Sequence, residues 1–206
     1  MGLPAGFRSR QELMDRERLA RALARMAREV HEAHPDVAST VLVGVRTRGV
    51  PLARRLARLI GAATGTEPPV GALDITLYRD DLTTIAPHPV LKGTDIPTTI
   101  DGRTVVLVDD VLYTGRTVRA ALDELVDFGR PGRIALAVLV DRGHRELPIH
   151  ADYVGRTVAT ASDEIVQVQL EEEDGEDRVL LLARAQPETG RPRASARPSR
   201  GPRKGR

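Results

Sequence analysis

The chain has no cysteine or tryptophan, and its aromatic residues are limited to three tyrosines and two phenylalanines. Without cysteine, it can form neither disulfide bonds nor a cysteine-ligated zinc site. The few aromatic side chains also argue against a nucleic-acid platform made of stacked rings. Any recognition of nucleic acid would therefore depend on phosphate contacts, arginine and the shape of the nucleic acid.

Long apolar runs are missing as well. No stretch approaches the roughly 20 apolar residues that span a bilayer, and the first residues lack the apolar core of a signal peptide. Together with the lack of cysteine, this pattern predicts a cytoplasmic protein without a membrane partner. The length of 206 residues fits one domain with a sizeable core.

The positive charge is concentrated at the C-terminal end. Residues 186–206 hold seven Arg or Lys and one Glu, a surplus of six that leaves a net charge of about −4 on residues 1–185. This segment is rich in Pro, Gly, Ser and Arg and lacks apolar periodicity, so we expect a disordered basic tail. It is either an electrostatic arm for RNA or another polyanion, or a solvated tail without a role.

Helix and strand patterns alternate along the rest of the chain. Helical spacing predicts helices over about 14–33, 50–61 and 116–128, the second ending at Gly61. Apolar runs predict strands over 41–45, 73–78, 104–108 and 134–140, and shorter ones over 152–154, 165–170 and 179–183. The acidic segment 171–177 is interpreted as a solvated turn. This order favours a three-layer α/β domain with a mostly parallel sheet over residues 15–185, preceded by an N-terminal extension over residues 1–14.

Residues 79–101, between two of the predicted strands, show no clear periodicity. A connection of this length is uncommon in a compact domain and predicts either a mobile functional loop or an excursion of the chain. Loops of this kind often close over an active site.

The segment VVLVDDVLYTGRT at 105–117 combines two kinds of ligand-binding group. Asp109 and Asp110 follow an apolar strand, and their carboxylates suit vicinal hydroxyls or a hydrated Mg²⁺. Residues 113–117 precede a helix, whose free amides suit a phosphate monoester. A ribose with a 5'-phosphate satisfies both halves. The alternative is that Asp109 is only a turn or capping residue and the glycine only serves the turn.

The same segment resembles the phosphoribosyl pyrophosphate (PRPP) motif of the type I phosphoribosyltransferases. Its ending is similar to that of the PyrR family, which regulates pyrimidine operons and also acts as a uracil phosphoribosyltransferase. Segments 44–56, 74–82, 90–97 and 125–155 resemble that family in the same order, so the likeness covers roughly residues 15–183. The resemblance implies a three-layer, mostly parallel sheet of the type I phosphoribosyltransferase kind with a small hood.

The resemblance also implies roles for individual residues. Asp109 and Asp110 would contact the ribose hydroxyls of PRPP, to which Mg²⁺ also binds, so that PRPP rather than the protein holds most of the metal. The 5'-phosphate would be held by Tyr113, Thr114, Gly115, Arg116 and Thr117, and the pyrophosphate by a loop containing Thr47, Arg48 and Gly49. Arg79 would begin the loop that closes over PRPP, Lys92 would also reach the pyrophosphate, and Asp141, Arg142 and Val166 would line the base pocket. Taken alone, residues 44–49 would be a basic turn between a strand and a helix.

A second implied function is RNA-binding regulation that senses UMP and UTP. In such a protein, a basic face of a homodimer or higher homo-oligomer would bind the mRNA leader of a pyrimidine operon. The candidates for this face are Arg25, Arg28, Arg145, His150 and Arg156. Exposed arginines are, however, usually solvated without a partner. The PRPP motif alone would also allow a transferase for another base, such as orotate or hypoxanthine, without an RNA role.

Overall fold

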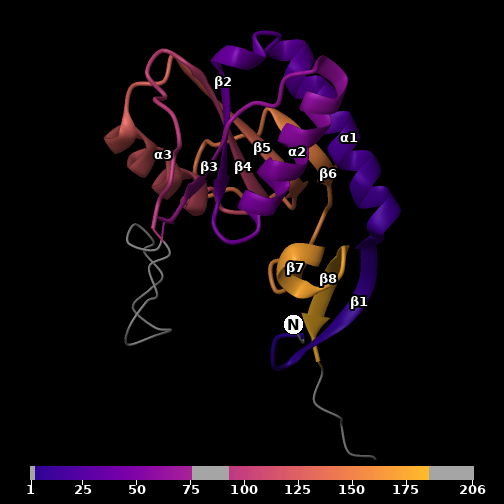
Figure 1. The fold of residues 1–206 in the computed structure, drawn as a ribbon. Helices are drawn as coiled ribbons and strands as arrows, with labels where there is room; N and C mark the ends of the chain where they lie inside the picture. Colours follow the sequence, from indigo (N-terminus) through magenta and orange to yellow (C-terminus); the bar gives the residue numbers. More distant parts are fainter. Residues whose placement is uncertain (1–2, 76–92, 186–206) are drawn as a thin grey trace, which may run out of the picture.

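Two sheets of different kinds organise the chain, and the computed structural model describes residues 3–75 and 93–185 of it (Figure 1). The main sheet is parallel and has the order β3-β2-β4-β5-β6. Its strands are β2 (Thr40–Val45), β3 (Val70–Leu73), β4 (Thr104–Leu112), β5 (Arg133–Asp141) and β6 (Tyr153–Thr157). The smaller sheet is antiparallel and has the order β1-β8-β7, from β1 (Phe7–Met14), β7 (Ile165–Gln169) and β8 (Arg178–Arg184).

Helices cover both faces of the main sheet, which gives the expected three layers. Residues of α1 (Arg16–Ala33) and α2 (Gly49–Thr64) pack in one core, and residues of α3 (Arg116–Phe128) pack in the other. The single turn α4 (Glu171–Asp174) and the 3₁₀ turn η1 (Val37–Ser39) are the other helical segments that the structure describes. Alternate residues of β4 enter different cores: Val106 packs with α1 and α2, and Leu107 packs with α3. Among the helices that the structure describes, none is both long and apolar enough to cross a membrane.

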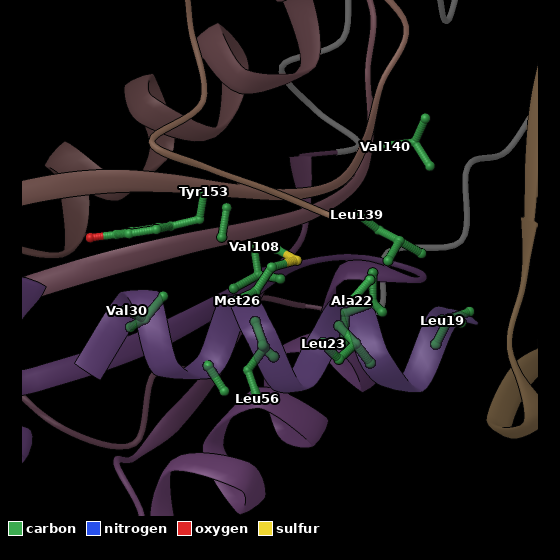
Figure 2. Packing of buried hydrophobic residues seen from close by; sticks show 14 of the residues in the cluster. Leu19, Ala22, Leu23, Met26, Val30, Leu56, Val108, Leu139, Val140 and Tyr153 are labelled. Carbon is green, nitrogen blue, oxygen red and sulfur yellow. The ribbon is translucent and has the colours of Figure 1, made fainter. Parts of the chain in front are cut away.

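The first helix illustrates how the apolar pattern becomes packing. Asp15 caps α1 by accepting a hydrogen bond from the Arg18 N–H at 2.7 Å. Leu19, Leu23 and Met26 recur at helical spacing, and each of these side chains is almost fully buried. Figure 2 shows Met26 and Ala22 on the side of α1 that faces Val108 and Leu139, and all of these residues belong to one buried cluster.

Several predicted boundaries differ from the observed ones. Helix α2 does not end at Gly61 but continues to Thr64, where Gly65 caps it with a φ of +80°. Strand β3 begins three residues before the predicted strand at 73–78, because Val70–Leu73 pair with Leu42–Val45 of β2. Residues 76–78 of that prediction lie outside the described residues. The periodicity is weak there because the strand consists partly of the small residues Gly71 and Ala72.

The smaller sheet contains the chain's N-terminal segment, which the sequence pattern assigns to an extension. Residues 7–14 form β1, which pairs along its length with β8. An apolar alternation is lacking in β1, since only Leu13 and Met14 at its end are buried. The small hood expected from the resemblance is therefore built from both ends of the described chain.

Candidate active site

A cavity of about 260 Å³ opens at the carboxyl edge of the main sheet, between β2 and β4. The chain leaves β2 for β3 on one side and β4 for β5 on the other, so this is the position where parallel sheets commonly bind ligands. The cavity is lined by Val45, Arg46, Thr47, Arg48, Ile75, Asp109, Asp110, Val111 and Thr117. The fold thus brings together the predicted pyrophosphate loop, the two aspartates and one threonine of the 113–117 segment.

The two aspartates occupy a part of β4 that has only one neighbouring strand. Pairing of β4 with β2 ends at Val108, whereas pairing with β5 continues to Leu112. The Asp109 carboxylate accepts the Asp110 N–H at 2.9 Å, and the Asp110 carboxylate accepts the Val111 N–H at 2.9 Å. Burial raises the pKa of Asp110, and the positive charge of Arg48 opposes this shift. Hydroxyl donors or a cation would stabilise the charged carboxylates at this place.

The 113–117 segment forms the turn that begins α3. Gly115 is the N-cap residue, with a φ of +93° that favours glycine, and it offers no side chain to the first amides of the helix. Thr114 O accepts the N–H groups of Glu146 and Leu147 at 3.0 and 3.2 Å, so the segment after β5 fixes this turn. A helix start of this kind suits an anion such as a phosphate.

The predicted pyrophosphate loop joins β2 to α2 and packs very closely against β4. The Arg46–Thr47 peptide bond is cis. A Cβ atom added at Gly49 would lie 2.3 Å from the Val108 carbonyl oxygen, and one added at Gly44 would lie 2.5 Å from Gly49 C and O. The two glycines therefore allow the loop to lie directly beside the strand that carries the aspartates.

Arg48 has a partner that the sequence pattern does not suggest. Its Nε and Nη2 groups donate to the two carboxylate oxygens of Asp174 at 3.1 and 2.8 Å. The interpretation of residues 171–177 as a solvated turn is wrong, because α4 packs against the start of α2 through this pair and through Arg55. Arg55 binds Glu172 and Asp177, each through two hydrogen bonds. A separation of 126 residues between Arg48 and Asp174 leaves no local signal of this contact.

The predicted base pocket is only partly assembled from its three residues. The Arg142 guanidinium lies 4.1 Å above the centroid of the Tyr113 ring and also donates to Ala161 O at 3.0 Å. Burial lowers the pKa of Arg142. Asp141 accepts hydrogen bonds from Arg145 Nη2 at 2.5 Å and from the Gly143 N–H at 2.9 Å. Asp141 and Arg142 thus lie at the carboxyl end of β5, next to the turn that carries Tyr113.

Val166 and Tyr113 are not among the residues that line the cavity. Val166 is 7% exposed and belongs to the hydrophobic core, against which Val111 packs. Tyr113, which the resemblance places among the phosphate-binding residues, is 36% exposed and contacts Arg142 and the ring of His144. The expected loop residues Arg79 and Lys92 lie outside the described residues.

Comparison with known proteins gives a consistent assignment. Residues 9–173 match the model of the phosphoribosyl transferase domain family. The bifunctional protein PyrR of Pelotomaculum thermopropionicum is 56% identical over 179 residues, which cover 87% of this chain and 99% of that protein. The bifunctional protein PyrR of Thermus thermophilus is 59% identical over 178 residues, which cover 86% of this chain and 98% of that protein. The chain belongs to the PyrR family.

Solved structures of similar fold are more distant from this PyrR family member in sequence. A hypoxanthine-guanine phosphoribosyltransferase from Bacillus anthracis has a TM-score of 0.63 at 19% identity, covering 84% of this chain and 98% of that one. A hypoxanthine phosphoribosyl transferase from Trypanosoma cruzi has a TM-score of 0.66 at 19% identity, and the match covers 88% of this chain and 94% of that one. These likenesses show the fold alone and confirm the expected type I phosphoribosyltransferase architecture.

The five residues considered for RNA binding in this PyrR family member have different environments. Arg25 on α1 donates to Val154 O and Gly155 O of β6 at 2.9 and 2.7 Å, and Arg156 of β6 donates to Leu13 O. Arg145 is held by Asp141 and by backbone carbonyls at the active-site edge. Arg28 and His150 are exposed. Three of the five side chains are therefore engaged within the protein itself.

Proposed function

We propose that the protein transfers the phosphoribosyl group of PRPP to uracil, forming UMP and pyrophosphate. The observation that carries the proposal is the cavity that Asp109, Asp110, Thr117 and the loop at Arg48 line together. One ligand with a pyrophosphate, two ribose hydroxyls and a 5'-phosphate matches these groups in charge and hydrogen-bonding capacity. The resemblance to the PyrR family points to uracil as the base.

The reaction displaces pyrophosphate from C1 of the ribose by a pyrimidine nitrogen. Negative charge grows on the leaving pyrophosphate, so the amides of Thr47–Gly49 and the cation of Arg48 would stabilise it. Positive character grows on the sugar, beside the carboxylates of Asp109 and Asp110. These groups act by positioning and electrostatics, and no covalent nucleophile is required.

Magnesium is the cofactor that this chemistry implies. Asp109 and Asp110 fit a hydrated Mg²⁺, since they offer two adjacent carboxylates in a site where burial raises the pKa of Asp110. They supply at most two protein ligands, so PRPP would supply most of the others. When bound, Mg²⁺ would neutralise charge on the pyrophosphate.

The base would lie near Tyr113, Asp141 and Arg142, at the carboxyl ends of β4 and β5. Arg142 fixes the Tyr113 ring by a cation–π contact at 4.1 Å, and Asp141 fixes Arg145. Uracil presents carbonyl acceptors and N–H donors, which backbone and polar side-chain groups in this region would recognise. Val166 would support this pocket by packing in the core and would not contact the base, because its side chain is buried.

Product formation tests the proposal directly. With PRPP and Mg²⁺, we expect UMP from uracil and little or no nucleotide from orotate or hypoxanthine when each base is supplied separately. Chelation of Mg²⁺ should abolish the reaction. Preference for orotate or hypoxanthine would instead make the protein a transferase for another base, and no product with any base would contradict the enzymatic proposal.

A second proposed function is regulation through RNA, because the PyrR relatives are named bifunctional. The partners would be UMP, UTP and the mRNA leader of a pyrimidine operon, with a homodimer or larger homo-oligomer as the binding unit. Because these nucleotides and this mRNA occur in the cytoplasm, we propose that the protein acts there.

Arg28 offers the sharpest test of RNA binding, because it is exposed and lies on α1 close to Arg25. Arg28→Glu should weaken binding of a pyrimidine-operon leader RNA about tenfold or more, through lost phosphate contact and added repulsion. Filter binding at several salt concentrations measures this effect. Arg119→Glu makes the same charge change on α3, across the sheet, and should have little effect. Equal affinities of the wild type and Arg28→Glu would remove α1 from the RNA-binding face.

A further inference from the structure

Arg48 interacts with two carboxylates that come from distant parts of the chain. One is Asp110, which lines the same cavity as Arg48 and acts on it through its negative charge. The other is Asp174 of α4, which binds Nε and Nη2 of Arg48 in a bidentate pair. Nη1 of Arg48 makes no hydrogen bond with any residue in the described ranges 3–75 and 93–185. One edge of the guanidinium is therefore fixed, while Nη1 can still bind a ligand.

Asp174 is itself held rigidly. Its side chain is completely buried, and its Oδ2 also accepts the Leu170 N–H at 3.0 Å. The turn that carries it is fastened to α2 by Arg55, which binds Glu172 and Asp177 independently of Arg48. Asp174 can therefore hold Arg48 in one orientation, rather than follow its movements.

We infer that Asp174 is a positioning residue for the pyrophosphate end of PRPP, which rests on the proposed phosphoribosyl transfer. By holding the Nε–Nη2 edge of Arg48, Asp174 fixes the guanidinium beside the pyrophosphate loop at the rim of the cavity. A long, flexible arginine side chain loses conformational entropy when it binds a ligand, and prior fixation removes most of that cost. The carboxylate of Asp174 thus acts on the ligand through Arg48.

The position of Asp174 limits its effect to one end of the substrate. The carboxylate contacts Arg48 and the start of α4, whereas the base region is built from Tyr113, Asp141 and Arg142. A general loss of folding would instead change the binding of both substrates. Separate measurements with PRPP and uracil can therefore distinguish positioning from a structural role.

Asp174→Asn removes the charge and the bidentate pair but nearly keeps the shape of the side chain. We expect the KM for PRPP and the inhibition constant of pyrophosphate to rise about tenfold, on the scale of a lost bidentate contact that preorganises a binding group. The KM for uracil should stay within about threefold of the wild type, because the base region is untouched. The value of kcat should fall as well, since Arg48 also stabilises the charge that grows on the leaving pyrophosphate. Asp174→Glu, which keeps the charge, should recover part of the affinity for PRPP.

Asp177→Asn is the matched control. It removes a carboxylate from the same acidic segment, but one that binds Arg55 rather than Arg48, while Glu172 still fastens the turn. Its KM for PRPP should equal that of the wild type. Asp174→Asn in an Arg48→Gln background should cause no further rise, because the residue through which Asp174 acts is already removed.

Three outcomes would overturn the inference: an unchanged KM for PRPP in Asp174→Asn, an equal rise in the KM for uracil, or the same tenfold effect in the Arg48→Gln background. Tighter binding of pyrophosphate by Asp174→Asn would also overturn it, since Asp174 would then compete with the ligand for Arg48. Calorimetry with pyrophosphate measures the effect without turnover. A wild type that binds pyrophosphate but makes no UMP would contradict the proposed transferase while leaving the role of Asp174 open to this test.

Discussion

Asp110→Asn is expected to lower kcat/KM for UMP formation by about 100-fold or more, a loss typical of removing a group that stabilises charge in the transition state. Asp110 lines the cavity from the part of β4 that extends beyond β2. Its carboxylate can accept hydrogen bonds from a ribose hydroxyl and stabilise the positive character of the sugar. Asparagine nearly keeps the shape and one acceptor oxygen, but it loses the negative charge.

The fold should survive this substitution, because the contact that Asp110 makes with the Val111 N–H needs only one acceptor oxygen. An amide oxygen can replace the carboxylate there, and circular dichroism and thermal unfolding would confirm this. Asp123→Asn is a suitable control, since Asp123 is an exposed carboxylate on α3 that pairs with Arg119. Near-normal turnover by folded Asp110→Asn would rule out a contact between this carboxylate and the ribose.

The parts of the fold that the sequence predicts are those coded by local periodicity. Helical spacing predicts a helix over residues 116–128, and α3 has the same bounds, because its buried residues recur at that spacing within one segment. Strand β1 is not predicted, because its pairing with β8 joins residues more than 160 positions apart and buries only its last two side chains. Long-range pairing of a mostly polar edge strand leaves little trace in local sequence.

The candidate site also has one part that the local sequence predicts and another part that depends on long-range contacts. The two aspartates and the turn at 113–117 lie in one continuous segment, so the local sequence alone is enough to recognise their chemistry. The Arg48–Asp174 pair and the contact of Arg142 with Tyr113 depend on how separate segments meet. Acidic residues in a short polar segment resemble a solvated turn until the tertiary structure supplies an arginine partner, which is why the interpretation of residues 171–177 is wrong.

Gly49→Ala is expected to lower both the stability of the fold and the affinity for PRPP. The added methyl group would lie 2.3 Å from the Val108 carbonyl oxygen, which belongs to the backbone of a central strand. Neither group can move without shifting α2 or β4, so we expect the free energy of unfolding to fall by about 2–3 kcal/mol. Because Gly49 ends the proposed pyrophosphate loop, the KM for PRPP should rise about tenfold as the loop is displaced.

Gly61→Ala provides the control within the same helix. Its Cβ would lie 3.0 Å from Glu67 Cβ and 3.2 Å from Glu67 Cα, a milder approach than at Gly49 and one to a connecting segment rather than to the sheet. Alanine also favours the helix by roughly 1 kcal/mol over glycine, so the free energy of unfolding should change by no more than about that amount. Urea unfolding of both variants measures the difference. If Gly49→Ala proved as stable as Gly61→Ala and bound PRPP normally, the close approach of α2 to β4 would not be what positions the pyrophosphate loop.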